Sequence, residues 1–257
     1  MAQQTKMPMV SVIMPAYNAA AYIAEAIRSV QSQTMMDWEL LVIDDCSSDD
    51  TRQIVQTLAR KDSRIHLLPN EKNMGTARTR NRGMDLCHGV YIALLDSDDV
   101  WYPQKLQQQI DLAEETGADI VYCSYAMVDQ QRKPKCPDFI VPAETDLEEM
   151  LVKSVISCST ALLRRSSVGD SRFPEDYYHE DYAFWLHLLQ RGLKARGTTD
   201  VLAEYRLIEN SRASNKLASA VRRWHIYREF LDYSVWRSAK YLARYAFAGC
   251  VKYRKKQ

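Results

Sequence analysis

The chain has 257 residues, a hydrophobic fraction of 46% and a net charge of only +1. This length and composition suffice for one large domain with at most a small appendage, and they exclude a disordered or fibrous protein. No apolar run reaches the ~20 residues that a membrane-spanning helix needs, and the start, MAQQTKMPMV, lacks the apolar stretch of a secretory signal, so we expect a cytosolic protein.

Short apolar runs alternate with helical patterns through the first half of the chain. The apolar runs predict strands at residues 9–14, 38–43, 65–68, 90–95 and 119–123. Helical spacing of apolar residues predicts helices at 19–33, 51–60, 75–87 and 103–116. Ser47 and Ser48 are candidate N-caps of the second helix. This alternation predicts βαβ units, and therefore an α/β fold whose parallel sheet is covered by helices.

The pattern changes after residue 123 to a polar segment with Pro134, Pro137 and Pro142, which predicts a lid or loop rather than core. In a βα sheet the ligand lies at the carboxyl ends of the strands. We therefore expect the functional residues directly after the first four strands.

Two of these strand ends are open to more than one interpretation. After the first strand, Pro15-Ala16-Tyr17-Asn18 is either an ordinary βα turn with a packed tyrosine or part of a nucleotide site. After the second strand, Asp44 and Asp45 are adjacent carboxylates that cannot both cap a helix. One of them could accept the imide N–H of a uracil or the hydroxyls of a ribose, although acidic residues are also common at helix starts.

The fourth strand runs directly into Asp96-Ser97-Asp98-Asp99, which is the sharpest signal in the sequence. Three carboxylates in four residues repel one another, and a divalent cation relieves that repulsion. Mg²⁺ and Mn²⁺ prefer oxygen ligands and bind through one or two carboxylates plus waters and substrate phosphates. The alternative is an acidic cap for the helix near Pro103, although a cap uses one carboxylate rather than three.

Other charged residues allow both a functional and a structural interpretation. No GxGxxG or GxxxxGK[ST] pattern occurs, so phosphate binding falls to the metal and to a cationic clamp at Arg78, Arg80 and Arg82, unless these are solvated helix charges. Glu180 and Asp181 begin an aromatic-rich helix and are either a general base or helix N-terminal charges.

Together, several segments resemble family 2 glycosyltransferases with the GT-A fold, of the bacterial type that builds surface polysaccharides. The matching segments are SVIMPAYN, WELLVIDDCSSDDT, NMGTARTRNRG, YIALLDSDDVW, HEDYAFWLHL and EYRLIENSRAS. They extend from about Val10 to Ser214 in the order and spacing of the family. Several motifs in register are far more specific than any one of them.

The resemblance assigns roles to individual residues. It implies a nucleotide site at Pro15, Tyr17, Asp45, Asn73, Arg80 and Asp98. It implies a Mn²⁺ or Mg²⁺ site at Asp96, Asp98 and Asp99. Asp181 would be the base that deprotonates the acceptor hydroxyl, in a single displacement that inverts the anomeric carbon.

The sequence departs from the family at two places. Cys46 stands where the family usually has glycine, so we expect a slightly different turn. Many members also have a histidine after the Tyr-Arg pair, whereas Tyr205-Arg206 is followed here by Leu207. A phosphate or metal role of that histidine would pass to Arg206 or Arg212.

The resemblance implies a GT-A domain over residues 1–213, with a nucleotide-sugar half at about 1–122, an acceptor half at about 123–213 and a helical tail at 214–257. From Leu217 the tail has ten lysines and arginines against two carboxylates, a net charge of +8, which leaves −7 for the rest of the chain. Trp224, Tyr227 and Leu231 lie at helical spacing, and Tyr241 and Tyr245 continue that stripe. The stripe packs on the catalytic domain, or the basic aromatic helix lies on an anionic membrane, and we favour membrane contact. Nucleic acid binding is a weaker use of the same charge, because no recognised nucleic-acid module accompanies it.

The expected reaction is transfer of a hexose from a UDP-sugar to a lipid-linked saccharide in O-antigen, capsule or related glycan synthesis. The enzyme would then be cytoplasmic and peripheral on the cytoplasmic face of the inner membrane. Two alternatives are transfer to polyprenyl phosphate and a non-catalytic nucleotide-sugar-binding scaffold.

Overall fold

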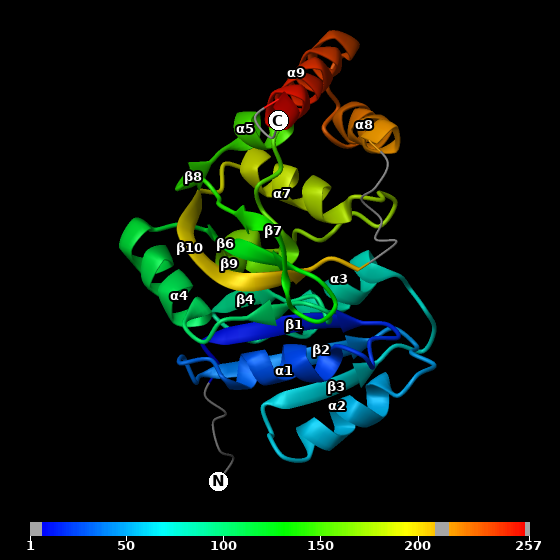
Figure 1. Ribbon diagram of the computed structural model, residues 1–257, viewed down its shortest axis with the longest axis vertical. Coiled ribbons are helices and arrows are strands. Elements are labelled where there is room, and N and C mark those ends of the chain that lie inside the picture. Colours follow the sequence, from blue (N-terminus) through cyan, green and yellow to red (C-terminus); the bar gives the residue numbers. More distant parts are fainter. Residues whose placement is uncertain (1–6, 209–215, 255–257) are drawn as a thin grey trace.

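Residues 7–208 and 216–254 are described by the computed structural model, and their core is a ten-stranded sheet with helices on both faces (Figure 1). The strands are β1 (Val10–Ala16), β2 (Trp38–Asp44), β3 (Ile65–Pro69), β4 (Tyr91–Leu94), β5 (Val100–Trp101), β6 (Ile120–Val128), β7 (Pro134–Phe139), β8 (Glu144–Thr145), β9 (Leu162–Arg164) and β10 (Ala195–Arg206). The helices are α1 (Ile23–Gln31), α2 (Thr51–Ala59), α3 (Thr76–Leu86), α4 (Lys105–Thr116), α5 (Leu147–Val152), α6 (Arg165–Val168), α7 (Glu180–Gln190), α8 (Lys216–His225) and α9 (Val235–Arg254). Short helical segments lie at Cys158–Thr160 and Ile226–Phe230.

The strands lie in the order β3-β2-β1-β4-β9-β6-β10-β5, with β7 paired to β6 and β8 to β10. β1 is parallel to β2 and β4, β2 is parallel to β3, and β6 is parallel to β10. β9 lies antiparallel between β4 and β6, so β4 and β6 also share one direction. The predicted α/β fold with a mostly parallel sheet is confirmed.

Alternate residues of the central strands face two different hydrophobic clusters, as the period of two in a strand requires. Val12 and Met14 of β1 pack in the cluster that contains residues of α1, α2 and α4. Ile13, between them, packs in the cluster that contains residues of α3 and α7. Because both faces of the sheet are covered, its strands are apolar throughout.

Some predicted elements differ from the structure. The expected lid or loop around Pro134 and Pro137 is wrong, since β7 forms an antiparallel pair with β6. Proline is tolerated there because β7 lies at an edge of the sheet. The second helix has Asp50 rather than Ser47 or Ser48 at its N-cap. The boundary placed at residue 122 falls inside β6, and the boundary at 213–214 lies outside the described residues.

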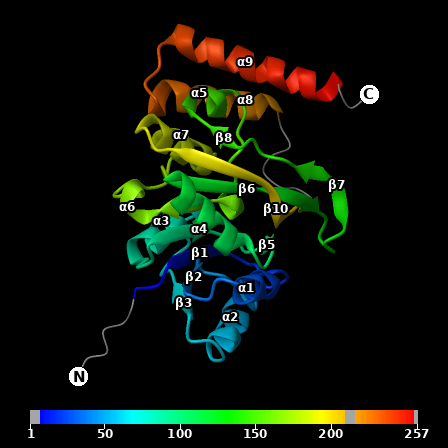
Figure 2. The ribbon, with the colours of Figure 1, turned by 90° about the vertical axis from the view of Figure 1, so that its left-hand side faces the viewer.

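The tail packs against the second half of the sheet domain through α8, α9 and the turn between them. Tyr227 is fully buried, and its hydroxyl donates to the carbonyl oxygen of Leu151 at 2.7 Å. The guanidinium carbon of Arg223 lies 4.1 Å from the ring centre of Tyr182 on α7 and 4.2 Å from that of Tyr245 on α9. Figure 2 shows α9 at one end of the molecule and α2 at the other. None of the helices that the structure describes has the length and apolarity to cross a bilayer.

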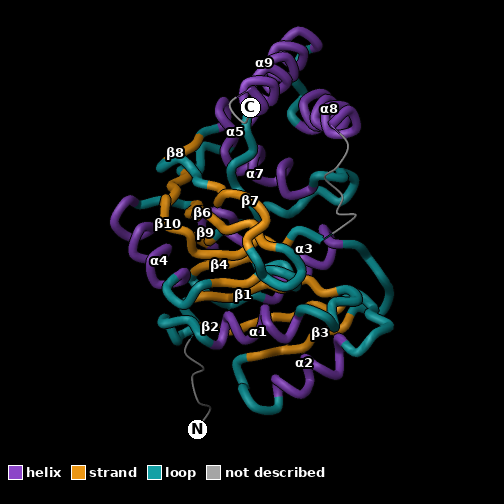
Figure 3. The backbone as a smooth tube through the Cα atoms, viewed as in Figure 1, coloured by secondary structure: helices purple, strands orange, loops and turns teal. Residues whose placement is uncertain are grey.

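The parallel strands place their carboxyl ends on the same side of the molecule. The loops that follow β1, β2 and β3 gather there, on the right of Figure 3. The amino end of α3 and the amino end of α7 face the same region in Figure 1. This is the side on which the sequence predicts the ligand.

Candidate active site

A cleft of about 560 Å³ opens at the carboxyl ends of β1, β2 and β4. Of the residues predicted from sequence it brings together Pro15, Tyr17, Asp45, Asn73, Arg80, Asp96, Asp98 and Arg206. These residues come from five separate segments of the chain. Arg212 lies outside the described residues.

Asp45 is the buried anchor of the cleft wall, with 4% of its surface exposed. Its carboxylate accepts hydrogen bonds from the backbone N–H groups of Met74 and Gly75, each at 2.8 Å, and from the side-chain amide of Asn70 at 2.7 Å. Asn73 donates to the carbonyl oxygen of Asp45 at 3.1 Å. Asp45 therefore fixes the loop that leads into α3. A carboxylate has about four acceptor positions, so capacity for one ligand donor remains.

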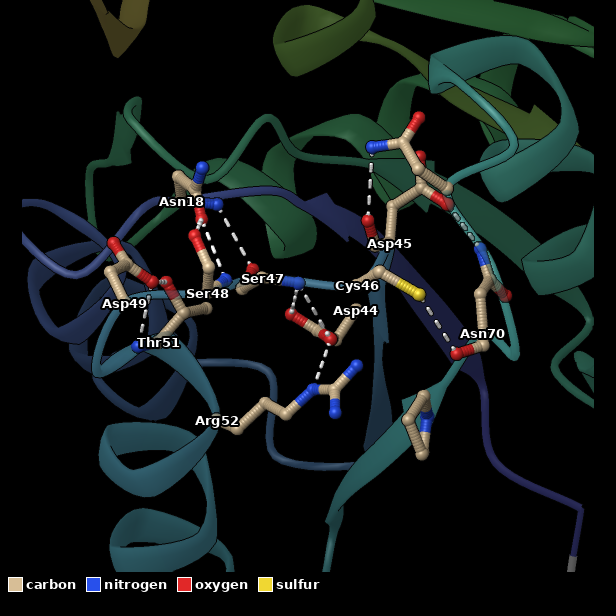
Figure 4. A network of polar contacts seen from close by, with 12 residues as sticks. Asn18, Asp44, Asp45, Cys46, Ser47, Ser48, Asp49, Thr51, Arg52 and Asn70 are labelled. Carbon is tan, nitrogen blue, oxygen red and sulfur yellow. Dashed lines mark hydrogen bonds and ion pairs between the residues drawn. The ribbon is translucent and has the colours of Figure 1, made fainter.

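A second set of polar contacts, shown in Figure 4, fixes the turn after Asp45. Asp44 is fully buried and accepts from Arg52 at 2.5 Å, while Asn18 accepts from the backbone N–H of Ser48 at 2.9 Å. Cys46, which follows Asp45 directly, has a φ of 63°, in the left-handed region that glycine adopts without strain. The departure from the family's glycine thus leaves the turn conformation glycine-like. The thiol donates to the carbonyl oxygen of Asn70 at 3.3 Å.

The two outward-facing carboxylates of the acidic motif are Asp96 and Asp98, which both line the cleft. Burial raises the pKa of Asp98 to about 6, and the negative charge of Asp96 adds to this increase. The alternative role as a helix cap is wrong, because α4 begins at Lys105 with Gln104 as its N-cap. The motif is therefore free to face the cleft.

Asp99 is not part of the cleft wall, which corrects its predicted role as a metal ligand. Only 2% of its surface is exposed, and one carboxylate oxygen accepts the backbone N–H of Arg206 at 2.9 Å. The other accepts the hydroxyl of Ser159. β5 follows at once and pairs with β10, which turns Asp99 inward. Its role is to join the acidic motif to β10.

The remaining donor set fits a divalent cation that arrives with its substrate. In the part of the chain that the structure describes, no group of three or more His, Cys, Asp or Glu side chains is placed to hold a metal ion by itself. Asp96 and Asp98 supply hard carboxylate oxygens at the cleft. Mg²⁺ and Mn²⁺ bind through one or two carboxylates and complete their shell with waters and phosphate oxygens.

Arg80 joins the acidic motif to α7. Its side chain is 6% exposed, and its two terminal nitrogens donate to Asp96 at 2.6 Å and to Glu180 at 3.0 Å. Burial alone would lower the pKa of Arg80, but the neighbouring carboxylates, Asp96 foremost, hold it above its ordinary value. Of the three arginines of the predicted clamp, only Arg80 lines the cleft. Arg78 pairs with Glu175 at 2.5 Å, and Arg82 donates to the backbone of Pro69 at 2.7 Å.

Arg206 lines the cleft but uses its guanidinium to hold the protein together. It donates to the carbonyl oxygens of Asp98 at 2.7 Å and Gln130 at 2.6 Å, and to the carboxylate of Glu25 at 2.6 Å. These contacts support the backbone of the acidic motif. These contacts give Arg206 a positioning role, and its predicted role in diphosphate binding stays a prediction.

Glu180 and Asp181 both begin α7, but the predicted base Asp181 is not among the residues that line the cleft. Glu180 lines the cleft, and burial raises its pKa while the charge of Arg80 opposes the increase. Asp181 accepts the backbone N–H of Tyr182 at 2.7 Å. Burial raises the pKa of the Cys158 thiol, which also feels the charges of Arg80, Asp96, Asp181 and Glu180. Asp181 follows Glu180 on α7, and its role as a base stays a prediction.

The cleft includes residues that the sequence did not single out. They are Ala16, Gly75, Thr76, Thr79, Ser97, Tyr205 and Ile208. Thr76, Thr79 and Arg80 lie at i, i+3 and i+4 on α3, so the face of the helix that carries Arg80 indicates both threonines. Tyr205 lies in the predicted Tyr-Arg pair but was given no role.

Comparison with known proteins shows that this chain matches a protein family. The family model for glycosyl transferase family 2 matches residues 11–171, which contain every cleft residue before α7. TuaG of Bacillus subtilis is 38% identical over 86% of this chain and 88% of its own length.

A second relative matches almost end to end. The Escherichia coli protein WfgD, a UDP-Glc:alpha-D-GlcNAc-diphosphoundecaprenol beta-1,3-glucosyltransferase, is 36% identical over 95% of both chains. Among solved structures, S. aureus TarS in complex with UDP-GlcNAc superimposes with a TM-score of 0.73 at 23% identity, over 92% of this chain and 71% of that one. The TarS likeness supports the GT-A fold.

Proposed function

Because this chain belongs to glycosyl transferase family 2, we propose that it moves a hexose from a UDP-sugar to a lipid-linked saccharide in the synthesis of a bacterial surface polysaccharide. The chain is a glycosyltransferase with the GT-A fold. One observation carries the proposal of substrates. WfgD, whose name specifies a UDP-glucose donor and a GlcNAc-diphosphoundecaprenol acceptor, is similar over nearly the whole of both chains.

The donor nucleotide would bind in the half of the cleft formed by β1, β2 and the start of α3. Tyr17 has 56% of its surface exposed and offers a ring face for a base. Asp45 has a remaining acceptor position for an imide N–H, and Asn73 lies beside it on the cleft wall. A uracil base supplies both a flat face and an imide donor, which supports a UDP-sugar.

The diphosphate would lie at Asp96 and Asp98. These carboxylates would hold Mn²⁺ or Mg²⁺, which supplies charge neutralisation for the departing diphosphate. Arg80 holds Asp96 in place, and Arg206 supports the backbone of Asp98. Both contacts come from buried guanidinium groups, so the acidic motif is organised before the donor binds.

Asp181 is the proposed general base. The acceptor hydroxyl oxygen attacks the anomeric carbon, the bond from that carbon to the diphosphate oxygen breaks, and UDP leaves with the electron pair. The hydroxyl proton passes to the carboxylate of Asp181. Glu180 is the less suitable base, since its carboxylate is held by Arg80 at 3.0 Å. One displacement inverts the anomeric centre, so an α-linked donor yields a β-linked product.

The tail would bring the enzyme to the membrane that carries its acceptor. On α9, Ser238 and Tyr241 are buried against the domain. Trp236 and Phe247 lie on the opposite face and are 86% and 72% exposed. Lys240 shares that face at helical spacing, with exposed Arg237 and Arg244 beside it. Exposed aromatics flanked by cations are typical of a helix that rests on an anionic leaflet.

Transfer of a labelled hexose with and without Mn²⁺ tests the proposed reaction. We expect label in a saccharide-diphosphate lipid when UDP-glucose is the donor. Label in polyprenyl phosphate would instead identify the alternative carrier-forming reaction. Binding of UDP-sugars without any transfer would identify a scaffold.

A further inference from the structure

The acidic motif at residues 96–99 is a tight turn that one side chain holds at both ends. The backbone N–H of Asp99 donates to the carbonyl oxygen of Asp96 at 3.1 Å, which closes the turn. The hydroxyl oxygen of Ser159 accepts the backbone N–H of Asp96 at 3.1 Å, and the same hydroxyl donates to the carboxylate of Asp99. Ser159 therefore contacts the first and the last residue of the motif, while Ser97 and Asp98 between them line the cleft.

These two contacts need a hydroxyl group in particular. A serine hydroxyl has one donor position and two acceptor positions. Its single proton goes to the carboxylate of Asp99, which can only accept when it is ionised. A lone pair of the same oxygen then meets the backbone N–H of Asp96, which can only donate. Alanine in place of Ser159 would remove both contacts at once.

Ser159 is itself fixed by contacts outside the motif. Only 2% of its surface is exposed, and its carbonyl oxygen accepts the indole N–H of Trp101 on β5 at 2.7 Å. The hydroxyl of Thr160 accepts the backbone N–H of Ser157 at 3.3 Å and donates to the carbonyl oxygen of Ser157 at 2.8 Å. These bonds close the short helical segment Cys158–Thr160, which carries Ser159. The hydroxyl of Ser159 therefore meets the acidic motif from a fixed position.

The position of the turn matters because a divalent cation tolerates little error in the placement of its ligands. Mg²⁺, for example, takes oxygen ligands at about 2.0–2.1 Å in a nearly ideal octahedron. Arg80 holds the carboxylate of Asp96, and Arg206 holds the carbonyl oxygen of Asp98. Ser159 adds the contact that fixes the backbone where the motif begins. Groups that only orient metal ligands typically change metal affinity by about 10–100-fold when they are lost.

We propose that Ser159 is a positioning residue for cation binding, whose hydroxyl sets the turn so that Asp96 and Asp98 present their carboxylates to the divalent cation of the nucleotide-sugar. This inference rests on the proposed function, in which a divalent cation binds at these two carboxylates. Ser159 acts through the motif, since it is buried and is not among the residues that line the cleft. It lies 60 residues after Asp99 in the chain, so its role follows from the fold alone.

Calorimetric titration of the full-length enzyme with UDP, in Mn²⁺ and in EDTA, tests this role. We expect the wild type to bind UDP more tightly in Mn²⁺, and Ser159→Ala to reduce that Mn²⁺-dependent gain in affinity about tenfold. Affinity for UDP in EDTA should stay at the wild-type value, because Tyr17 and Asp45 lie on the cleft wall outside the motif. Ser159→Cys fills the same space with a poorer donor and acceptor, and it should cause a smaller loss of the gain. If Ser159→Ala does not fold, Ser159→Cys makes the same comparison.

Ser124→Ala is the matched control for loss of a buried hydroxyl. Ser124 is fully buried on β6, and its hydroxyl accepts the backbone N–H of Val141 at 3.1 Å and donates to the carbonyl oxygen of Thr198 at 3.3 Å. Both alanine variants should lower the melting temperature, because each leaves buried polar groups unpaired. Only Ser159→Ala should reduce the Mn²⁺-dependent gain.

Two results would overturn the positioning role of Ser159. One is a wild-type Mn²⁺-dependent gain in both Ser159 variants that fold, and the other is an equal loss of the gain in Ser124→Ala. Failure of the proposed function gives a different result. A wild-type enzyme that binds UDP more tightly in Mn²⁺ but transfers no hexose would contradict the proposed reaction, and the same titrations would still decide the role of Ser159.

Discussion

Arg80 and Asp96 are joined by a hydrogen bond of 2.6 Å that ties α3 to the acidic motif after β4. The same guanidinium reaches Glu180 at the start of α7, so one buried arginine connects three parts of the active site. The two carboxylates are 16 and 100 residues away from it in the chain. The active site therefore depends on a long-range contact of one side chain.

Arg80→Met should destabilise the protein by about 3 kcal/mol, because it leaves the buried carboxylate of Glu180 and the partly exposed carboxylate of Asp96 without their partner. Arg78→Met is the matched control on the same helix. Its side chain is 51% exposed and its ion pair with Glu175 lies at the surface, so the change should stay below about 1 kcal/mol. Urea unfolding of both variants measures the difference. Equal unfolding midpoints would contradict the structural role of Arg80.

Chelation by EDTA should abolish turnover, and Asp98 and Asp99 should respond differently to substitution. Asp98→Ala should weaken Mn²⁺-dependent donor binding about tenfold or more, since loss of a group that only orients a metal ligand already has an effect of that size. The melting temperature should change little. Asp99→Ala should lower the melting temperature, because it leaves the backbone N–H of Arg206 unpaired at a cost of about 1–3 kcal/mol. Calorimetry and melting curves measure these effects. Full activity in EDTA would contradict a role of a divalent cation in turnover.

The difference between Asp98 and Asp99 marks the limit of what the sequence predicts. The motif indicated carboxylates at a strand end, and that location is confirmed. Which of them faces the cleft depends on β5 and on Ser159, a residue 60 positions further along the chain. Local spacing does not contain this contact.

Other elements show the same division between local pattern and long-range contact. The alternating pattern of the first half predicted β1, β2, β3, β4 and β6, because periodicity is a local property. It did not predict β9 and β10, which also lie inside the sheet. The prolines of β7 suggested a loop, since only the position at a sheet edge makes a strand possible there. Arg80 was interpreted as a clamp or a solvated charge, and its burial became visible only with its distant carboxylate partners.

Asp181→Asn should preserve donor binding and lower turnover by about 10²-fold or more, the usual range for loss of a positioned base. Glu180→Gln is the neighbouring control. It should mainly lower the melting temperature, because the ion pair with Arg80 is lost. Single-turnover kinetics with saturating donor separates the two. A larger kinetic loss in Glu180→Gln than in Asp181→Asn would transfer the base to Glu180.

Lys105 should make stability depend on pH in the alkaline range. The residue is fully buried, and its Nζ lies 4.0 Å from the ring centre of Trp101 and donates to Gln109 Oε1 at 2.6 Å. Burial lowers the pKa of Lys105 from 10.5 to about 8. Between these values the unfolded chain binds more protons, so this residue's contribution to stability increases as pH rises. The difference in unfolding free energy between wild type and Lys105→Met should therefore shift in favour of wild type by about 3 kcal/mol from pH 7.5 to 10.5. Parallel pH profiles would contradict a charged, buried lysine.

The exposed aromatic face of α9 should be needed for membrane binding but not for folding. Trp236→Ser combined with Phe247→Ser should abolish flotation with anionic liposomes at an unchanged melting temperature. Met36→Ser, which alters a side chain that is 59% exposed near the start of β2, is the matched control. These point variants are sharper than truncation before Val235, because truncation also removes buried Tyr241.

Salt supplies a second measurement on the same liposomes. Attraction of cations to an anionic surface falls off within a Debye length of ~8 Å at physiological ionic strength, so high salt should weaken flotation of the wild type. Equal flotation of the wild type and the double variant would show that α9 only packs on the domain.

The anomeric configuration of the product distinguishes a single displacement from every mechanism that retains the configuration. UDP-glucose, Mn²⁺ and a short-chain GlcNAc-diphosphate lipid are incubated with the wild-type enzyme, and the new linkage is identified by NMR. We predict a β-linked glucose from the α-linked donor, because one attack opposite the leaving diphosphate inverts the anomeric carbon. An α-linked product would contradict the single displacement and the role of Asp181, and absence of transfer from every UDP-sugar tested would contradict the proposed function.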